Sequence, residues 1–110
     1  MAFTPYHNIT GSTGVDVELI APGENVGEIR SIMIANTHAT ADATVSLFIQ
    51  DNPTAAAAST FKIISTVAIP SDTSLLLDNS SVLSFNNSSS GYGLYLTVGS
   101  SDTLDVMINR

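Results

Sequence analysis

The two histidines are the residues best suited to acid–base or metal chemistry in this sequence of 110 residues, because it contains no cysteine. His7 lies near the N-terminus, and His38 lies in the segment NTHAT between two strand-like runs. A catalytic or zinc site needs several ligating side chains to converge, and neither histidine has the helical HExxH spacing. We therefore predict solvated histidines, no catalytic residue, no metal ligand and no cofactor.

The carboxylates offer two alternatives. Asp16 and Glu18 share one face of a strand-like run, and Asp102 and Asp105 flank the start of another. Calcium needs several oxygens in one place, and no loop has the D-x-D-x-D-G pattern, so only a site built from separate loops stays open. A carboxylate pair for glycoside hydrolysis also stays open, although the chain has no tryptophan to line a sugar cleft.

The charge balance argues against nucleic acid as a partner. Three Lys and Arg stand against ten Asp and Glu, which gives 3 − 10 = −7. Phosphate backbones are bound by clustered cations, and Arg30, Lys62 and Arg110 are scattered along the chain. The first residues show neither a basic segment nor an apolar one, and no apolar run approaches 18 residues. We expect no secretory signal and no membrane contact.

Alternation of apolar and polar residues dominates the chain and predicts an all-β fold. The strands are expected at about 15–20, 26–36, 43–50, 60–69, 73–78, 81–86, 93–98 and 103–109. The missing strand–helix alternation and the regular turn spacing favour an antiparallel β-sandwich of seven to eight strands. A jelly roll is the first choice and an immunoglobulin-like sandwich the second. Within 26–36 the apolar parity switches, which a β-bulge or a strand covered on both faces would explain.

The domain organisation follows from the same pattern. Residues 1–14 have few periodic apolar positions and contain Pro5, Gly11 and Gly14, so we expect an extended N-terminal arm. Residues 15–110 form a single β-sandwich domain in this interpretation, because no repeat, linker or charge block divides them.

Several large apolar residues fall on the outward parity of their predicted strands. If Val45, Leu47 and Ile49 point into the core, the residues Phe48, Ile64, Tyr95 and Met107 point outward. Single exposed apolar residues are common on monomers, but a cluster of them would form a contact patch. We predict that these four residues, with Phe3 and Tyr6 of the arm, form a protein interface. The scarcity of lysine suits such a surface.

Five segments carry a resemblance to a known family. They are VGEIRSIMIAN at 26–36, ATVSLFI at 43–49, VAIP at 67–70, SLLL at 74–77 and LDVMI at 104–108. Over residues 15–110 this order resembles small β-sandwich virion structural proteins of tailed bacteriophages, especially marine and cyanobacterial phages. The resemblance implies a capsid decoration or cement protein, or a neck, collar, tail or fibre component, and it implies no catalytic residue.

We therefore expect a non-enzymatic virion protein that binds the major capsid protein or other virion proteins after synthesis in the host cytoplasm. A homo-oligomer, with a trimer favoured, would multiply weak contacts by avidity. The main alternative is a small carbohydrate-binding or adhesion module, and a small enzyme is a further one.

Overall fold

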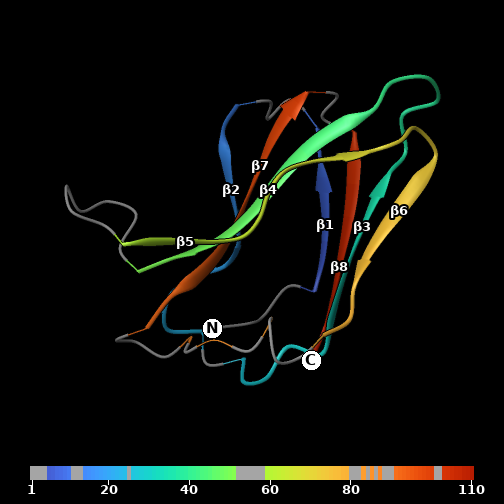
Figure 1. The fold of residues 1–110 in the computed structure, drawn as a ribbon. Coiled ribbons are helices and arrows are strands. Elements are labelled where there is room, and N and C mark those ends of the chain that lie inside the picture. Colours follow the sequence, from blue (N-terminus) through green and yellow to red (C-terminus); the bar gives the residue numbers. More distant parts are fainter. Residues whose placement is uncertain are drawn as a thin grey trace.

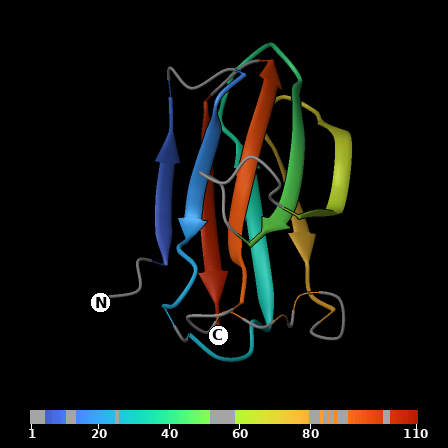
Figure 2. The ribbon, with the colours of Figure 1, turned by 90° about the vertical axis from the view of Figure 1, so that its left-hand side faces the viewer.

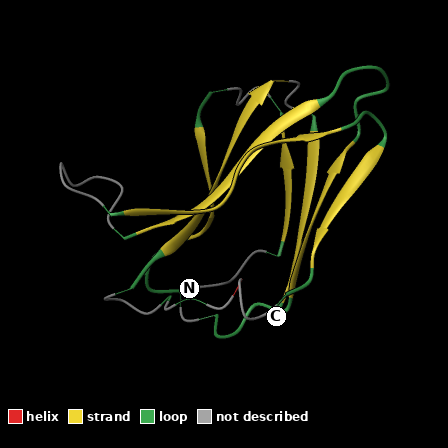
Figure 3. Ribbon diagram, viewed as in Figure 1, coloured by secondary structure: helices red, strands yellow, loops and turns green. Residues whose placement is uncertain are grey.

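The computed structural model describes residues 5–10, 14–24, 26–51, 59–79, 83, 85, 87, 91–100 and 103–110, and strands make up most of this part (Figure 3). The strands are β1 (Tyr6–Ile9), β2 (Asp16–Ile20), β3 (Ser31–Asn36), β4 (Ala43–Gln50), β5 (Thr60–Ile69), β6 (Thr73–Leu77), β7 (Gly93–Ser100) and β8 (Leu104–Asn109). No helix among the described residues is long and apolar enough to cross a membrane.

The strands form two antiparallel four-stranded sheets. Sheet A has the order β1-β8-β3-β6 and sheet B has the order β2-β7-β4-β5 (Figures 1 and 2). The pairs β4–β5, β3–β6, β2–β7 and β1–β8 are all hydrogen-bonded neighbours, as if one long hairpin had been rolled up from its tip at β4–β5. This is the jelly-roll arrangement. The predicted all-β jelly-roll sandwich is confirmed, and the immunoglobulin-like order is not found.

The core follows from the alternation along each strand. In β3, β4 and β8 nearly every second residue is buried, because alternate side chains point to opposite faces of a sheet. The inward-facing side chains of both sheets meet in one layer. Its largest fully buried members are Ile9, Ile20, Ile29, Ile32, Ile34, Leu47, Ile69, Leu83, Leu94, Leu96, Leu104 and Ile108.

The expected arm over residues 1–14 needs a correction. Tyr6–Ile9 form β1, which pairs antiparallel with β8 and completes sheet A, while Ile9 is buried in the core. An alternation over four residues beside a proline is too short to be recognised in the sequence. In the structure all four residues nevertheless pair with β8. Residues 1–4 and 11–13 lie outside the described residues.

Two expected strands also differ. The strand expected at 26–36 begins only at Ser31, so the parity switch marks the start of β3 and not a bulge within it. Ile29 is nevertheless fully buried, and Gly27 before it has φ of +79°. Leu83 and Phe85, the described members of the expected strand 81–86, are not in strand conformation.

The buried side chain of Asn36 bonds to three backbone groups at one end of the sandwich. Its Nδ2 donates to the carbonyl oxygens of Ala41 and Ile69, both at 2.9 Å, and its Oδ1 accepts from the N–H of His38 at 3.0 Å. The amide therefore ties the β3–β4 loop to the end of β5. Only 2% of the residue is exposed, and its bond to Ile69 is buried, so this polar side chain depends on partners within the protein.

Replacing Asn36 by alanine should leave these backbone groups without their hydrogen-bond partner. We expect Asn36→Ala to lower the free energy of unfolding by about 2–4 kcal/mol, since each buried polar group without a partner costs about 1–3 kcal/mol. Urea unfolding measures the loss. The control is Asn8→Ala, which removes an exposed bond to Asp105 and should cost about 0.5 kcal/mol. Equal losses in the two variants would contradict the role given to Asn36.

Gly93 lies where β7 begins against the end of β2. A Cβ there would lie 2.6 Å from the backbone oxygen of Ile20 and 2.7 Å from Cδ of Pro22. Gly93→Ala should therefore destabilise the protein by about 1–3 kcal/mol, as overpacking does. Gly99→Ala is the matched control in the same strand, because the only close approach of its Cβ would be to the side-chain Oγ1 of Thr44, while the backbone oxygen lies at 3.7 Å. Thermal unfolding should show the larger loss for Gly93→Ala.

Candidate functional site

The outer face of sheet A carries a row of large apolar side chains that crosses all four strands. Tyr6 is opposite Met107, Met107 is opposite Met33, and Met33 is opposite Leu76. Tyr6 is 68% exposed and Leu76 is 57% exposed, with the two methionines half-buried between them. We call these four residues the apolar row.

Polar residues flank the apolar row on both sides. On one side Asn8 Nδ2 donates to Asp105 Oδ1 at 2.6 Å, and on the other Asn109 Nδ2 donates to Ser31 Oγ at 3.0 Å. A shallow depression of about 320 Å³ lies over the tyrosine end of the row. An apolar centre with a polar rim is the usual anatomy of a protein–protein contact, and methionine adapts its shape to a partner.

The outer face of sheet B has a different character. Glu18, Tyr95, Phe48 and Lys62 lie side by side on four strands. The rings of Phe48 and Tyr95 stack with centroids 5.8 Å apart and planes 20° apart, and each residue is only 4% exposed. The predicted interface pair therefore packs against itself and leaves little surface for a partner.

The hydroxyl of Tyr95 is held by an acidic neighbour. It donates a hydrogen bond of 3.1 Å to Glu18 Oε2, while Asp16 accepts a bond of 2.7 Å from Thr97 Oγ1. Burial, together with the negative charges of Glu18 and Asp16, raises the pKa of Tyr95 well above its ordinary value. The expected acidic face of β2 exists, and its carboxylates bond to sheet B.

The remaining predicted interface residues are divided by the fold. Tyr6 and Met107 lie together in the apolar row, as direct partners in register. Ile64 does not point outward as expected: it lies opposite Leu47 and packs against the core. Register shifts in the β4–β5 pairing and the positive φ of Thr66 (+53°) break the simple alternation of β5. Phe3 lies outside the described residues.

Met33 and Leu76 are the members of the row that sequence reasoning missed. The signal was present, because Ile32 and Ile34 alternate with Met33, and the inward Leu75 and Leu77 enclose Leu76. The uninterrupted run of three leucines hid the alternation in β6. Knowing that β3 lies between β8 and β6 is what brings the four side chains into one line.

The described histidine and aspartate side chains that the sequence suggested for chemistry make hydrogen bonds within the fold. His38 Nδ1 accepts hydrogen bonds from the backbone N–H groups of Thr40 and Ala41 and so shapes the β3–β4 loop. Asp105 accepts from Asn8, and Asp102 lies outside the described residues. Within the described part of the chain, no group of three His, Asp or Glu side chains is placed to hold a metal ion.

Comparison with known proteins adds no relative to this description: no family model, curated protein or solved structure matches the chain.

The buried Tyr95 phenol predicts an alkaline loss of stability. Because its pKa is raised on folding, its contribution is complete below the unfolded value of 10.0 and is lost as the pH rises above it. We expect Tyr95→Phe to lose less stability than the wild type between about pH 9 and 11. Urea midpoints across this range measure the slope, with Tyr6→Phe as the exposed control. If the free energy of unfolding of Tyr95→Phe falls with pH as steeply as that of the wild type, the raised pKa of Tyr95 is contradicted.

Proposed function

We propose that this protein is a non-enzymatic structural protein of a tailed-phage virion that binds the outer surface of the head as a decoration or cement protein. The observation that carries the proposal is the apolar row, an open contact surface on a rigid sheet. The family resemblance of residues 15–110 supplies the virion context. A neck, collar, tail or fibre position is the alternative within the same class, since it needs the same kind of surface.

The surface chemistry supports permanent packing against other proteins. The chain has three basic residues in 110 and a net charge of −7, so its surface holds few of the flexible, strongly hydrated lysines that make burial costly. The acidic surplus repels nucleic acid and keeps a coated particle soluble. The row lies on strands whose neighbours fix it, so little order has to be gained on binding.

A carbohydrate-binding module is the second candidate function. Phe61 and Tyr92 form an edge-to-face pair with centroids 5.8 Å apart, and Phe61 is exposed. Exposed rings are the surface such a module needs. Binding on a glycan array that is lost in Phe61→Ala would favour this function over the first.

The first test is composition. Mass spectrometry of purified virions, from the phage whose genome encodes this chain, should detect its peptides, and immunogold labelling should place them on the head. Labelling at the neck or tail would move the protein to the alternative position. Peptides found in infected cells but not in particles would overturn the virion role.

The second test addresses the surface. On heads assembled from the accompanying capsid genes without this protein, Met107→Glu should bind at least roughly tenfold more weakly than the wild type, because it buries a charge in the contact. Val15→Glu is the control: Val15 is 59% exposed but lies outside the row. Co-sedimentation measures binding, and equal affinities for the two variants would exclude the apolar row as the contact.

A further inference from the structure

The four edge strands of the sandwich differ in how they are protected from pairing with another chain. β1 has only four residues. β2 carries Asp16 and Glu18 and has a register shift, and β5 carries Lys62 and two register shifts. Shortness, charge and bulges are the usual protections of an edge. β6 (Thr73–Leu77) has neither a charge nor a bulge. Its five pairs with β3 are continuous, and it contains no charged residue.

The core is also less covered beside β6 than on the opposite side. At the β1–β2 side of the sandwich, Ile9, Leu19 and Ile20 are fully buried. At the β5–β6 side, the inward-facing residues remain partly exposed although they pack against the core; they are Ile63, Ile64, Leu75 and Leu77. On the β1–β2 side only Val17 is partly exposed in the same way. More apolar surface is therefore left in water beside β6, and covering it would be favourable.

The direction in which each backbone N–H and C=O of β6 points follows from the hydrogen bonds of β3 and β8. The N–H of Thr37 donates to the carbonyl of Thr103, in register with the β3–β8 pairs. Because successive residues direct their backbone groups to opposite sides, the even-numbered residues of β3 bond to β6. Their partners Leu75 and Leu77 bond back to β3, and Ser74 and Leu76 therefore direct N–H and C=O toward the open edge.

We propose that two copies of this protein pair through β6, antiparallel about a two-fold axis, with Leu76 opposite Leu76 of the second copy. The two A sheets then form one eight-stranded sheet. This register sets Asp78 opposite Ser74 of the second copy, whose hydroxyl can donate to the carboxylate. A register centred on Leu75 would set Asp72 opposite Asp78, and like charges directly opposite each other are destabilising.

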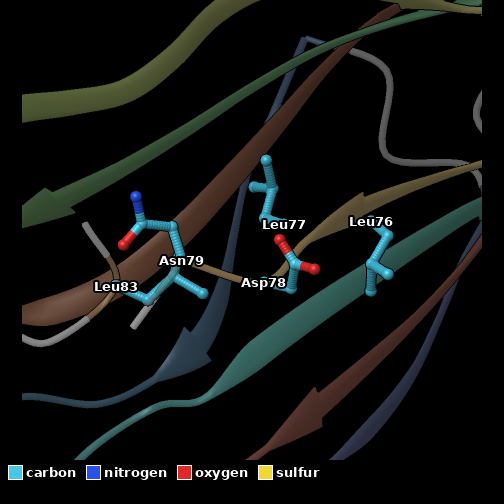
Figure 4. Close-up of a pocket in the computed structure, with 5 residues that line it drawn as sticks. All are labelled: Leu76, Leu77, Asp78, Asn79 and Leu83. Atoms are coloured by element: carbon cyan, nitrogen blue, oxygen red, sulfur yellow. The ribbon is translucent and has the colours of Figure 1, made fainter. Parts of the chain in front are cut away.

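A small pocket at the end of β6 fits this pairing. It has a volume of about 170 Å³ and is lined by Leu76, Leu77, Asp78, Asn79 and Leu83 (Figure 4). In the proposed register, Leu75 of the second copy lies opposite Leu77, on the inward side of the sheet, and beside this pocket. An apolar side chain from the second copy would thus cover the partly exposed leucines of the first, and the reverse holds by symmetry.

The two-fold pairing differs from the trimer favoured from the sequence, and it does not depend on the virion role. It makes the apolar rows of two copies continuous, because each row ends at Leu76. A dimer would therefore present one surface twice as long, and binding at both halves would be strengthened by avidity.

The first experiment measures the mass of the purified protein alone, by light scattering after size exclusion. We expect about 23 kDa, twice the chain mass of 11.5 kDa. Ser74→Asp places two carboxylates opposite each other at both ends of the pairing and should raise the dimer Kd roughly tenfold, whereas Ser74→Lys faces Asp78 and should lower it. A monomer at every soluble concentration, a trimer, or the same effect of both substitutions would overturn the proposal.

The second experiment tests the register by crosslinking, since the chain has no native cysteine. Opposed residues of a hydrogen-bonded pair have Cα atoms about 5.5 Å apart, which a disulfide can bridge. Leu76→Cys should give a disulfide-linked dimer under mild oxidation. Ser74→Cys, on the same strand and face, places its two thiols four residues out of register, about 14 Å apart, and should stay unlinked. Equal crosslinking of both variants, or of neither, would overturn the register and with it the proposal.

Discussion

The burial of alternate side chains between two sheets is the constraint on which the rest of this structure depends. The chain has no cysteine to staple it, so its stability rests on apolar surface removed from water in one layer. That layer is built from alternate residues of β3, β4, β7 and β8, the central strands of the two sheets. The outward-facing side chains of these strands do not belong to that layer. They make contacts among themselves on sheet B and remain partly exposed on sheet A.

The outer faces of the two sheets have opposite roles in this view. On sheet B the outward positions satisfy one another: Phe48 stacks on Tyr95, and Tyr95 donates to Glu18. On sheet A the outward residues Tyr6 and Leu76 stay exposed with the methionines between them. A face that is satisfied within the chain needs no partner, whereas an apolar face left open gains by finding one. The asymmetry leaves the sandwich with one outer face that carries exposed apolar side chains in a row.

Sequence patterns predicted the fold well where the information is local. Seven of the eight strands overlap expected segments, most of which alternate over five or more residues. β1 escaped recognition, since four residues beside Pro5 make no pattern and its partner β8 is almost a hundred positions away. Ile64 was misplaced because bulges in β5 depend on pairing with β4. The apolar row was predicted only in Tyr6 and Met107, as its continuity comes from strand order, which alternation does not encode.

The rolled-hairpin order has a consequence for how the molecule is assembled. The β4–β5 pair joins segments close in sequence, whereas β1 and β8 must close a loop of almost the whole chain, and such non-local pairing is entropically costly and slow. We therefore expect β1, an edge strand of four residues, to dock after the inner pairs and to detach early in local opening. During synthesis β8 leaves the ribosome after β1, β3 and β6. Met107, which lies between Tyr6 and Met33, is therefore the last member of the apolar row to become available. The apolar row is therefore a property of the finished sheet, because no shorter part of the chain can bring its four side chains into one line.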